Sequence, residues 1–396
     1  MTDRNRTFAL PGIHQLSKEQ DAAMGLPLTG QHLIVGGPGT GKSVVALLRA
    51  RRLTKSGAKY RFLVYNHLLD QSNRHLFGRE QSLTANTWET WFRQIWFEIF
   101  RERIPTHDPK PNTDYREIDW ARVERQIAVQ PKGSPVHSDC PALVIDEGQD
   151  MPAAFYRALT NLGFEDFYVV ADQNQQIHPE RCSSRQDLQD CLGLDPGETI
   201  ELRVNYRNSH RIAALARHFF TGDPASPPPE LPPQGTSDLA PRLVVYGSAT
   251  RWTFDGIAGF ILQLSDRQPR KLIGIITPNN NVREKFLAAL HVSNPRLEND
   301  RPPIQTYASS NQAAVDFGTG GIVVINAHSC KGLEFDIALL ADIDAHQPKR
   351  DPHALRSRFY VMVARAREQV ILLRTGEVCP VVEGLLPADP ALLTRS

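Results

Sequence analysis

Residues 36–43 hold the first side chains whose types and spacing could do chemistry. The run reads Gly-Gly-Pro-Gly-Thr-Gly-Lys-Ser and fits the phosphate-loop pattern of a glycine, four residues, then Gly-Lys-Ser/Thr. Glycines allow backbone N–H groups to turn toward phosphate oxygens where a side chain would block them. Lys42 is expected to reach the β- and γ-phosphates, and the Ser43 hydroxyl to hold Mg²⁺. The sequence therefore predicts a nucleotide-binding site. Its other loop contacts are Gly39, Thr40 and Gly41.

A second group of polar residues follows the apolar run 142–145. This run leads into Asp146 and Glu147, the first residues of Asp-Glu-Gly-Gln-Asp. The Asp146 carboxylate can hold Mg²⁺, because a small, hard cation prefers oxygen ligands. Glu147 can then polarise the water that attacks the γ-phosphate, and a metal beside it offsets the repulsion between two adjacent carboxylates. An ordinary acidic turn at a strand end is the alternative, which a neighbouring phosphate loop disfavours.

The elements that must position these residues follow from the hydrophobic pattern. Residues 32–35 predict a strand before the phosphate loop, and residues 44–52 predict a helix after it, as the motif requires. The runs 142–145 and 167–171 predict buried parallel strands, and ligands bind at the carboxyl ends of such strands. The second half of the chain alternates in the same way, so we expect an α/β fold with two domains. Its predicted strands are 243–246, 272–276, 321–325, 337–340 and 370–373, and its predicted helices are 253–265, 282–291 and 354–366.

The boundary between the two domains is expected in a proline-rich stretch. Residues 222–238 contain six prolines and few apolar residues, which predicts a semi-rigid linker. A rigid surface loop within one domain is the alternative. We expect a first, ATP-binding domain over 1–221, the linker over 222–240 and a second domain over 241–396.

Several further motifs occur in order, and together they resemble the UvrD/Rep-type helicases and translocases of superfamily 1. The matching segments are residues 16–20, 36–43, 146–150, 171–175, 205–207, 328–336 and 360–367. The resemblance covers nearly the whole chain. It implies two RecA-like P-loop domains with parallel sheets, and ATP and Mg²⁺ as ligands. Glu334, in the segment 328–336, joins the ATP contacts on this basis.

The resemblance also implies a role for the other matching residues. Gln20 would read adenine, Tyr206 would stack on it, and Gln175 would sense the γ-phosphate. Arg207 would contact the γ-phosphate, and Arg365 would reach ATP from the second domain. Both arginines would add positive charge as charge builds on the phosphate oxygens in the transition state. Hydrolysis of ATP between the two domains would then report that they have closed.

Four residues are expected to face nucleic acid. They are Tyr65, Thr87, Trp88 and His328, and for His328 an interior histidine is the even alternative. Aromatic residues recur at helical spacing from Trp88 to Phe100, and this stripe could offer bases a stacking platform. A small helical core is the reading that we favour for most of these rings.

The chain departs from the family pattern in two motifs and in size. Ala364 stands where relatives usually have threonine, and residues 178–181 replace an aromatic residue that stacks on a base. The first domain has room only for a small helical insertion, about residues 92–138, and the segment 290–321 leaves no room for a large second one. These features suggest a minimal motor. Translocation along a single strand is therefore a safer expectation than processive unwinding.

Bulk composition limits the remaining possibilities. The 396 residues carry a formal net charge of only +1, so nucleic-acid binding would have to come from a local groove. The five cysteines are scattered, and their odd count argues against a disulfide framework. No apolar run is long enough to span a bilayer, and no leader pattern opens the sequence. We expect a cytoplasmic protein without a membrane partner.

Three functions are compatible with these motifs. The first is an ATP-dependent motor on single-stranded nucleic acid, DNA more than RNA, moving 3′ to 5′ as the resemblance implies. The second is an ATP-gated subunit that senses nucleic acid and signals to a nuclease or effector, by analogy with antiviral defence systems. The third, a nucleotide-binding scaffold without chemistry, conflicts with the intact set of polar residues named above.

Overall fold

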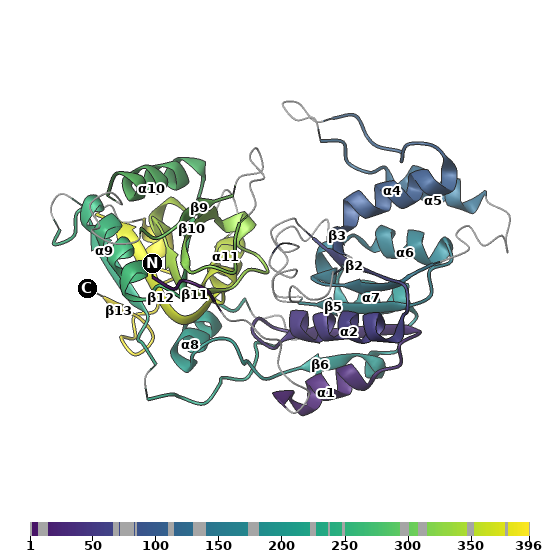
Figure 1. The fold of residues 1–396 in the computed structure, drawn as a ribbon, viewed down its shortest axis with the longest axis horizontal. Helices are drawn as coiled ribbons and strands as arrows, with labels where there is room; N and C mark the ends of the chain where they lie inside the picture. Colours follow the sequence, from purple (N-terminus) through teal and green to yellow (C-terminus); the bar gives the residue numbers. More distant parts are fainter. Residues whose placement is uncertain are drawn as a thin grey trace. The chain divides into compact units, whose positions relative to one another are not determined.

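Residues 2–6 and most of the chain from Gln15 onward are described by a computed structural model (Figure 1). The chain divides into two compact units. The first unit comprises residues 10–36 and 42–202, and the second comprises residues 1–9, 37–41 and 203–396. The described ranges are 2–6, 15–65, 71, 83, 85–109, 115–129, 140–172, 182–221, 227–236, 238–247, 250–293, 301–307, 315–346, 352–376 and 379–395.

The first unit is built on a parallel sheet with the strand order β3-β2-β4-β5-β1-β6. The strands are β1 (Gln31–Gly36), β2 (Tyr60–Val64), β3 (Ala85–Thr87), β4 (Ala142–Ile145), β5 (Phe167–Ala171) and β6 (Ile200–Leu202). The helices are α1 (Lys18–Gly25), α2 (Lys42–Ser56), α4 (Trp88–Phe100), α5 (Trp120–Ala128), α6 (Ala153–Asn161) and α7 (Arg185–Leu192). Short 3₁₀ helices are η2 (Gly148–Asp150) and η5 (Pro196–Glu198).

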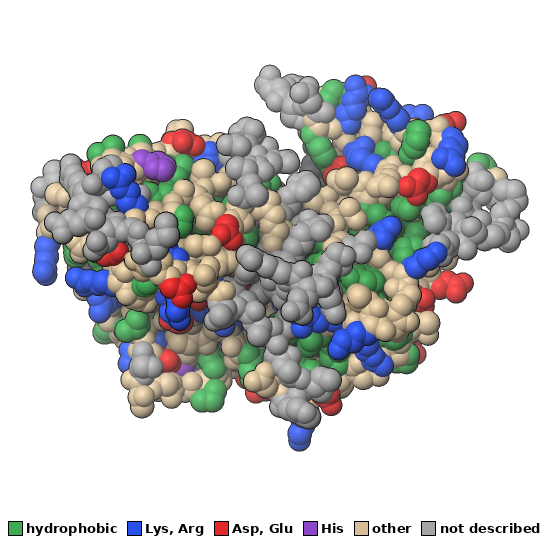
Figure 2. All heavy atoms as spheres, viewed as in Figure 1, with side chains coloured by type: hydrophobic (Ala, Val, Ile, Leu, Met, Phe, Trp, Pro, Cys, Tyr) green, Lys and Arg blue, Asp and Glu red, His purple; other side chains and the backbone are tan. Residues whose placement is uncertain are grey.

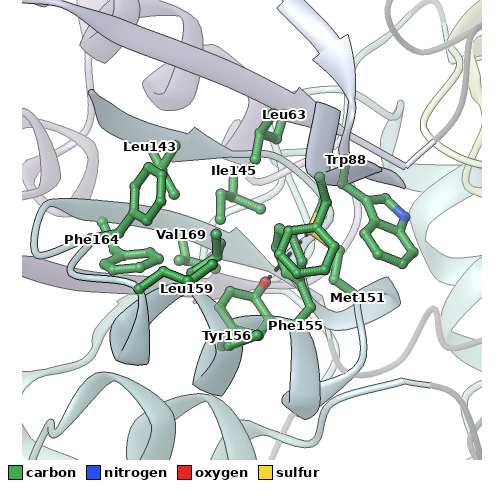
Figure 3. Packing of buried hydrophobic residues seen from close by; sticks show 14 of the residues in the cluster. Leu63, Trp88, Leu143, Ile145, Met151, Phe155, Tyr156, Leu159, Phe164 and Val169 are labelled. Carbon is green, nitrogen blue, oxygen red and sulfur yellow. Dashed lines mark hydrogen bonds between the residues drawn. The ribbon is translucent and has the colours of Figure 1, made fainter. Parts of the chain in front are cut away.

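Alternate residues of β1, β2, β4 and β5 enter two different cores. Leu63, Ile145 and Val169 pack on one face against α4, α5, α6 and α7 (Figure 3). Val144 and Val170 pack on the other face against α1 and α2. Since both faces of the sheet are covered, the strands read as continuous apolar runs rather than alternating ones. This explains why their positions could be predicted.

The helical insertion of the first unit is held by aromatic packing. Trp88 stacks on Trp120 with ring centroids 6.4 Å apart, and its edge meets Phe155 at 5.1 Å. Trp91, Phe92 and Trp96 are also buried, so the preference for a helical core is confirmed. Phe97 is the exception, with half of its surface exposed. Figure 2 shows lysine and arginine side chains gathered over this insertion.

The second unit has its own parallel sheet, ordered β13-β7-β12-β11-β8-β10-β9. Its strands are β7 (Arg242–Tyr246), β8 (Leu272–Thr277), β9 (Ile304–Thr306), β10 (Gly321–Asn326), β11 (Phe335–Leu340), β12 (Ala366–Thr375) and β13 (Thr394–Arg395). Its helices are α8 (His210–His218), α9 (Phe254–Arg267), α10 (Asn280–Ser293), α11 (Pro352–Val363) and α12 (Pro380–Glu383), with 3₁₀ turns η7 (Ala327–Ser329) and η8 (Ile343–Ala345). Helices α9 and α10 cover one face, and α8 and α11 pack on the other. The predicted α/β class with two parallel sheets is therefore confirmed.

Residues 2–6 also belong to the second unit, which the sequence did not suggest. Asn5 forms a β-bridge with Thr319. The Arg6 guanidinium pairs with the Asp336 carboxylate at 2.8 Å and donates to the Phe317 carbonyl at 2.9 Å. Both members of the ion pair are nearly buried, with 4% and 10% of their side-chain surfaces exposed. The second unit is thus completed by a segment from the other end of the chain.

The division of the chain differs from the boundary expected at residue 221. Helix α8 packs on α11 and β12, so it falls in the second unit. The described part of the proline-rich stretch contacts residues of the second unit. Glu230 bridges to Val204, and the Pro232 carbonyl lies 2.7 Å from Nδ1 of His210. These contacts place the described part of the stretch within the second unit.

A buried histidine makes the stability of the second unit depend on pH. His346 is 1% exposed, and neither ring nitrogen has a hydrogen-bond partner in the described ranges. Burial, with smaller contributions from the neighbouring Arg358 and His328, lowers the pKa of His346 from 6.5 to about 3. The unfolded chain therefore binds a proton that the folded chain does not as the pH falls from 6.5 toward 3. The free energy of unfolding should fall by about 1.4 kcal/mol per pH unit across that window. Above pH 6.5 the contribution of His346 to stability is complete.

Urea unfolding between pH 7 and 4 measures this effect. The His346→Phe variant should lose the part of the pH slope that comes from this imidazole. Parallel slopes for the variant and the wild type would contradict the assignment.

No helix in the ranges given above is long and apolar enough to cross a lipid bilayer.

Candidate nucleotide site

The phosphate loop connects β1 to α2 and has the backbone that its glycines permit. Gly39 and Gly41 have φ values of +81° and +86°, a region in which other residues are strained. The Thr40 hydroxyl donates to the Gly37 carbonyl at 2.9 Å and braces the turn. A Cβ atom on Gly39 would lie only 2.2 Å from Oδ1 of Asn205, so a side chain has no room there. The loop therefore keeps bare backbone where the motif expects phosphate.

Lys42 begins α2 and points at the end of a neighbouring strand. Its Nζ donates to Oδ2 of Asp172 at 3.2 Å. The side chains are 7% and 0% exposed, so this is a buried ion pair. Asp172 directly follows β5, which lies between β1 and the acidic strand β4 in the sheet. The carboxyl ends of these three strands thus bring the phosphate-loop lysine to a carboxylate for which the sequence had predicted no role.

The acidic pair follows β4 in a tight, strained turn. Asp146 is fully buried, and its Oδ1 accepts the N–H of Glu147 at 3.0 Å. Glu147 is 5% exposed and has φ +55°, which costs about 1–3 kcal/mol for a residue other than glycine. A Cβ atom on the next residue, Gly148, would lie 2.4 Å from Cγ1 of Val169. The glycine and the strained glutamate together allow the chain to turn sharply here.

Gln149 forms hydrogen bonds with both Glu147, after β4, and Asp172, after β5. Its Nε2 donates to Oε2 of Glu147 at 2.6 Å. Its Oε1 accepts the main-chain N–H of Asp172 at 2.8 Å. Gln149 is fully buried, and its own carbonyl accepts the N–H of Ser183 at 2.9 Å. Lys42, Asp172, Gln149 and Glu147 therefore form one connected series within the first unit.

The second unit carries a cluster of arginines around Glu334. Arg207 donates to one carboxylate oxygen of Glu334, and Arg367 lies 3.8 Å from the other. Burial tends to raise the pKa of Glu334, but the guanidinium groups of Arg207 and Arg367 outweigh it and lower the pKa below its usual value. Nε and Nη1 of Arg207 are buried and have no partner among the described residues. Two N–H-bearing nitrogens of Arg207 are thus available for an anion.

Tyr206 and Arg365 lie in the same unit. Tyr206 is 55% exposed, and its N–H donates to the Gly39 carbonyl at 2.8 Å. Arg365 is 1% exposed, and its guanidinium donates to the carbonyl of Val361 at 3.0 Å and, more weakly, to that of Leu333 at 3.4 Å. The Leu333 carbonyl immediately precedes Glu334. Arg365 therefore braces the main chain that carries this glutamate.

Comparison of the sequence with known protein families found a match. Residues 321–373 match the family described as UvrD-like helicase C-terminal domain. The match begins with β10 and ends within β12, and it includes Glu334 and Arg365. This match supports the resemblance to UvrD-type helicases and suggests a helicase-like function.

A solved structure was also found, whereas comparison with curated proteins gave no match. The structure is the C-terminal domain of a possible DNA helicase from Lactobacillus plantarum WCFS1. It is 19% identical, covers 48% of this chain and 99% of its own, and has a TM-score of 0.34.

The remaining predictions for the nucleotide site concern Gln20, Ser43 and Gln175. Gln20 is buried and completes a capping box with Ser17, whose N–H donates to Oε1 of Gln20 at 3.1 Å. Ser17 therefore caps α1. Ser43 is partly exposed as the second residue of α2. Gln175 lies outside the described residues.

The residues expected to face nucleic acid differ in their exposure to solvent. Tyr65 follows β2 and is 39% exposed, and His328 in η7 is exposed. Thr87 is 8% exposed, and its hydroxyl donates to Oγ1 of Thr90 at 2.8 Å. Trp88 is 9% exposed and packs in the aromatic core of the insertion (Figure 3). A buried indole cannot stack on a base, so the prediction for Trp88 does not fit this structure.

The side chains present fit a nucleoside triphosphate with Mg²⁺. The loop has the positive-φ glycines that expose N–H groups, and Lys42 supplies a cation beside them. Ser43 and Asp146 are the oxygen donors that would hold Mg²⁺. The buried, unpartnered nitrogens of Arg207 suit an anion.

Proposed function

We propose that this chain is an ATP-dependent enzyme that moves along single-stranded nucleic acid. Hydrolysis of ATP would drive the movement, on DNA more than RNA and from 3′ to 5′, as in the UvrD-type proteins that it resembles. The main support is the connected series Lys42–Asp172–Gln149–Glu147, which joins the phosphate loop to the acidic turn. A scaffold without chemistry would not need a strained glutamate held by a dedicated glutamine.

Each residue of the site has a role in this proposal. Lys42 and the loop N–H groups would hold the phosphates, with Ser43 and Asp146 holding Mg²⁺. When bound, Mg²⁺ supplies positive charge to the phosphate oxygens and neutralises part of the acidic turn. The Glu147 carboxylate would accept a proton from the attacking water. Arg207, Arg365 and Gln175 would stabilise the γ-phosphate.

The first experiment compares ATP hydrolysis with and without single-stranded DNA in the wild type and in Glu147→Gln. Strong stimulation by DNA is expected in the wild type. The variant should lose about 10²-fold in kcat, because an amide cannot accept the proton. The exposed Glu165 provides the control Glu165→Gln, which should behave as the wild type. A wild type that hydrolyses no ATP, or a fully active Glu147→Gln, would overturn the proposal.

The second experiment asks whether hydrolysis moves the protein. ATP should displace a protein block from the 5′ end of a single strand and leave a block at the 3′ end in place. DNA-stimulated hydrolysis without displacement would instead favour a gating subunit that signals to a partner. Repeating the assay on RNA tests the preference for DNA.

A further inference from the structure

Gln149 donates one hydrogen bond and accepts another, a combination that its primary amide supplies and that neither a carboxylate nor an apolar side chain can make. Its NH₂ group donates to the Glu147 carboxylate at 2.6 Å, and its carbonyl oxygen accepts the Asp172 N–H at 2.8 Å. A carboxylate would have no proton to donate to Glu147, and an apolar side chain would make neither bond. Gln149 is fully buried, so lost bonds would not be replaced by bulk water.

The partners of Gln149 are the two elements whose relative position matters for hydrolysis. The Glu147 side chain needs a hydrogen bond from another residue to hold it in place, because its own backbone is strained and lies in a tight turn. Asp172 is fixed by the buried pair with Lys42, which starts the helix after the phosphate loop. Gln149 is therefore the side-chain link between the loop that would hold phosphate and the carboxylate that would act on water.

We propose that Gln149 is a positioning residue that sets the Glu147 carboxylate at a fixed place relative to the phosphate loop. This inference rests on the proposed ATP hydrolysis by the same site. Gln149 itself would not contact nucleotide. It would act through Glu147, by holding one oxygen of its carboxylate in place. Movement of a catalytic group by about 1 Å can cost about 10²-fold in rate, so one lost bond should be measurable.

Steady-state hydrolysis of ATP at saturating single-stranded DNA tests this role with two variants. Gln149→Met keeps the volume and removes both bonds, and Gln149→Asn is too short to make both at once. Each should lower kcat by about 10²-fold. The KM for ATP, and the dissociation constant of a non-hydrolysable ATP analogue measured by calorimetry, should change by less than about twofold. If Gln149→Met does not fold, the measurements on Gln149→Asn alone decide the test.

Gln189 gives a matched control in the same unit. It is also buried, at 3% exposed, and its Nε2 donates to Oγ1 of Thr199 at 2.9 Å. Gln189→Met loses a buried hydrogen bond but touches no residue of the site, so its kcat should equal that of the wild type. Equal losses of kcat in the two Met variants would mean that any buried glutamine matters, which would overturn the inference.

A double-mutant cycle with Glu147→Gln separates positioning from general damage. If Gln149 acts through Glu147, adding Gln149→Met to Glu147→Gln should change the residual rate by less than about twofold. A further loss as large as in the wild-type background would overturn the inference. So would weaker binding of the ATP analogue in proportion to kcat, or unchanged kcat in both single variants of an active enzyme. A wild type without ATP hydrolysis would remove the proposed function as well, so the two failures are distinguishable.

Discussion

Replacing Lys42 by methionine should both stop ATP hydrolysis and destabilise the first unit. Hydrolysis should fall by about 10³-fold, because the site loses a cation that would stabilise the charge developing on the phosphate oxygens. The fully buried Asp172 carboxylate would also lose its lysine. Breaking a buried pair from one side costs about 3–5 kcal/mol. Assays of DNA-stimulated hydrolysis and urea unfolding measure the two effects separately.

A second substitution tells these two effects apart. Lys42→Met combined with Asp172→Asn also removes the buried carboxylate charge, so stability should return while hydrolysis stays absent. Lys55→Met, on an exposed residue in the last turn of α2, should leave both unchanged. Recovery of hydrolysis in the double variant would show that the lysine serves only the fold.

Replacing Arg6 by methionine should destabilise the second unit by about 3–5 kcal/mol, because the Asp336 carboxylate would stay buried without its guanidinium. The same carboxylate oxygen accepts the Leu272 N–H at 2.8 Å, at the start of β8. Faster hydrogen exchange should therefore appear in β8 and in its neighbour β10. Thermal unfolding should shift to lower temperature.

The same segment supplies a control for this ion pair. Arg270 pairs with Asp3, but their side chains are 67% and 52% exposed. Exposed pairs contribute about 0–1 kcal/mol, so Arg270→Met should have little effect. Comparable losses for the two arginines would contradict the importance given to burial. Adding Asp336→Asn to Arg6→Met should restore most of the lost stability.

The elements of the sheets were largely predictable from the sequence. The strands predicted at 142–145 and 167–171 match β4 and β5, and the helix predicted at 253–265 lies within two residues of α9 at each end. Both faces of each sheet are covered by helices, so central strands become unbroken apolar runs that are easy to recognise. The glycines and acidic residues that end these runs could be assigned to turns for the same reason.

The contacts within the site could not be predicted, because they depend on the order of strands in the sheet. Asp172 meets Lys42 only because β5 lies next to β1, and a sequence does not give that order. Gln149 stood in a recognised motif, yet its bonds depend on the turn at Glu147. Trp88 was expected at the surface by its place in a motif, but the aromatic packing of the insertion buries it.

The place of Arg6 in the fold has a consequence for biosynthesis. Residues 2–6 are translated before every other described part of the chain, whereas Asp336 comes 330 residues after Arg6. At about 5–20 residues per second, the ribosome needs roughly 15–65 s to cover that distance. During this interval Asp336 and Thr319, the partners of Arg6 and Asn5, have not yet been synthesised. The second unit can therefore close only late in elongation, which leaves the nascent amino-terminal segment open to chaperones until then.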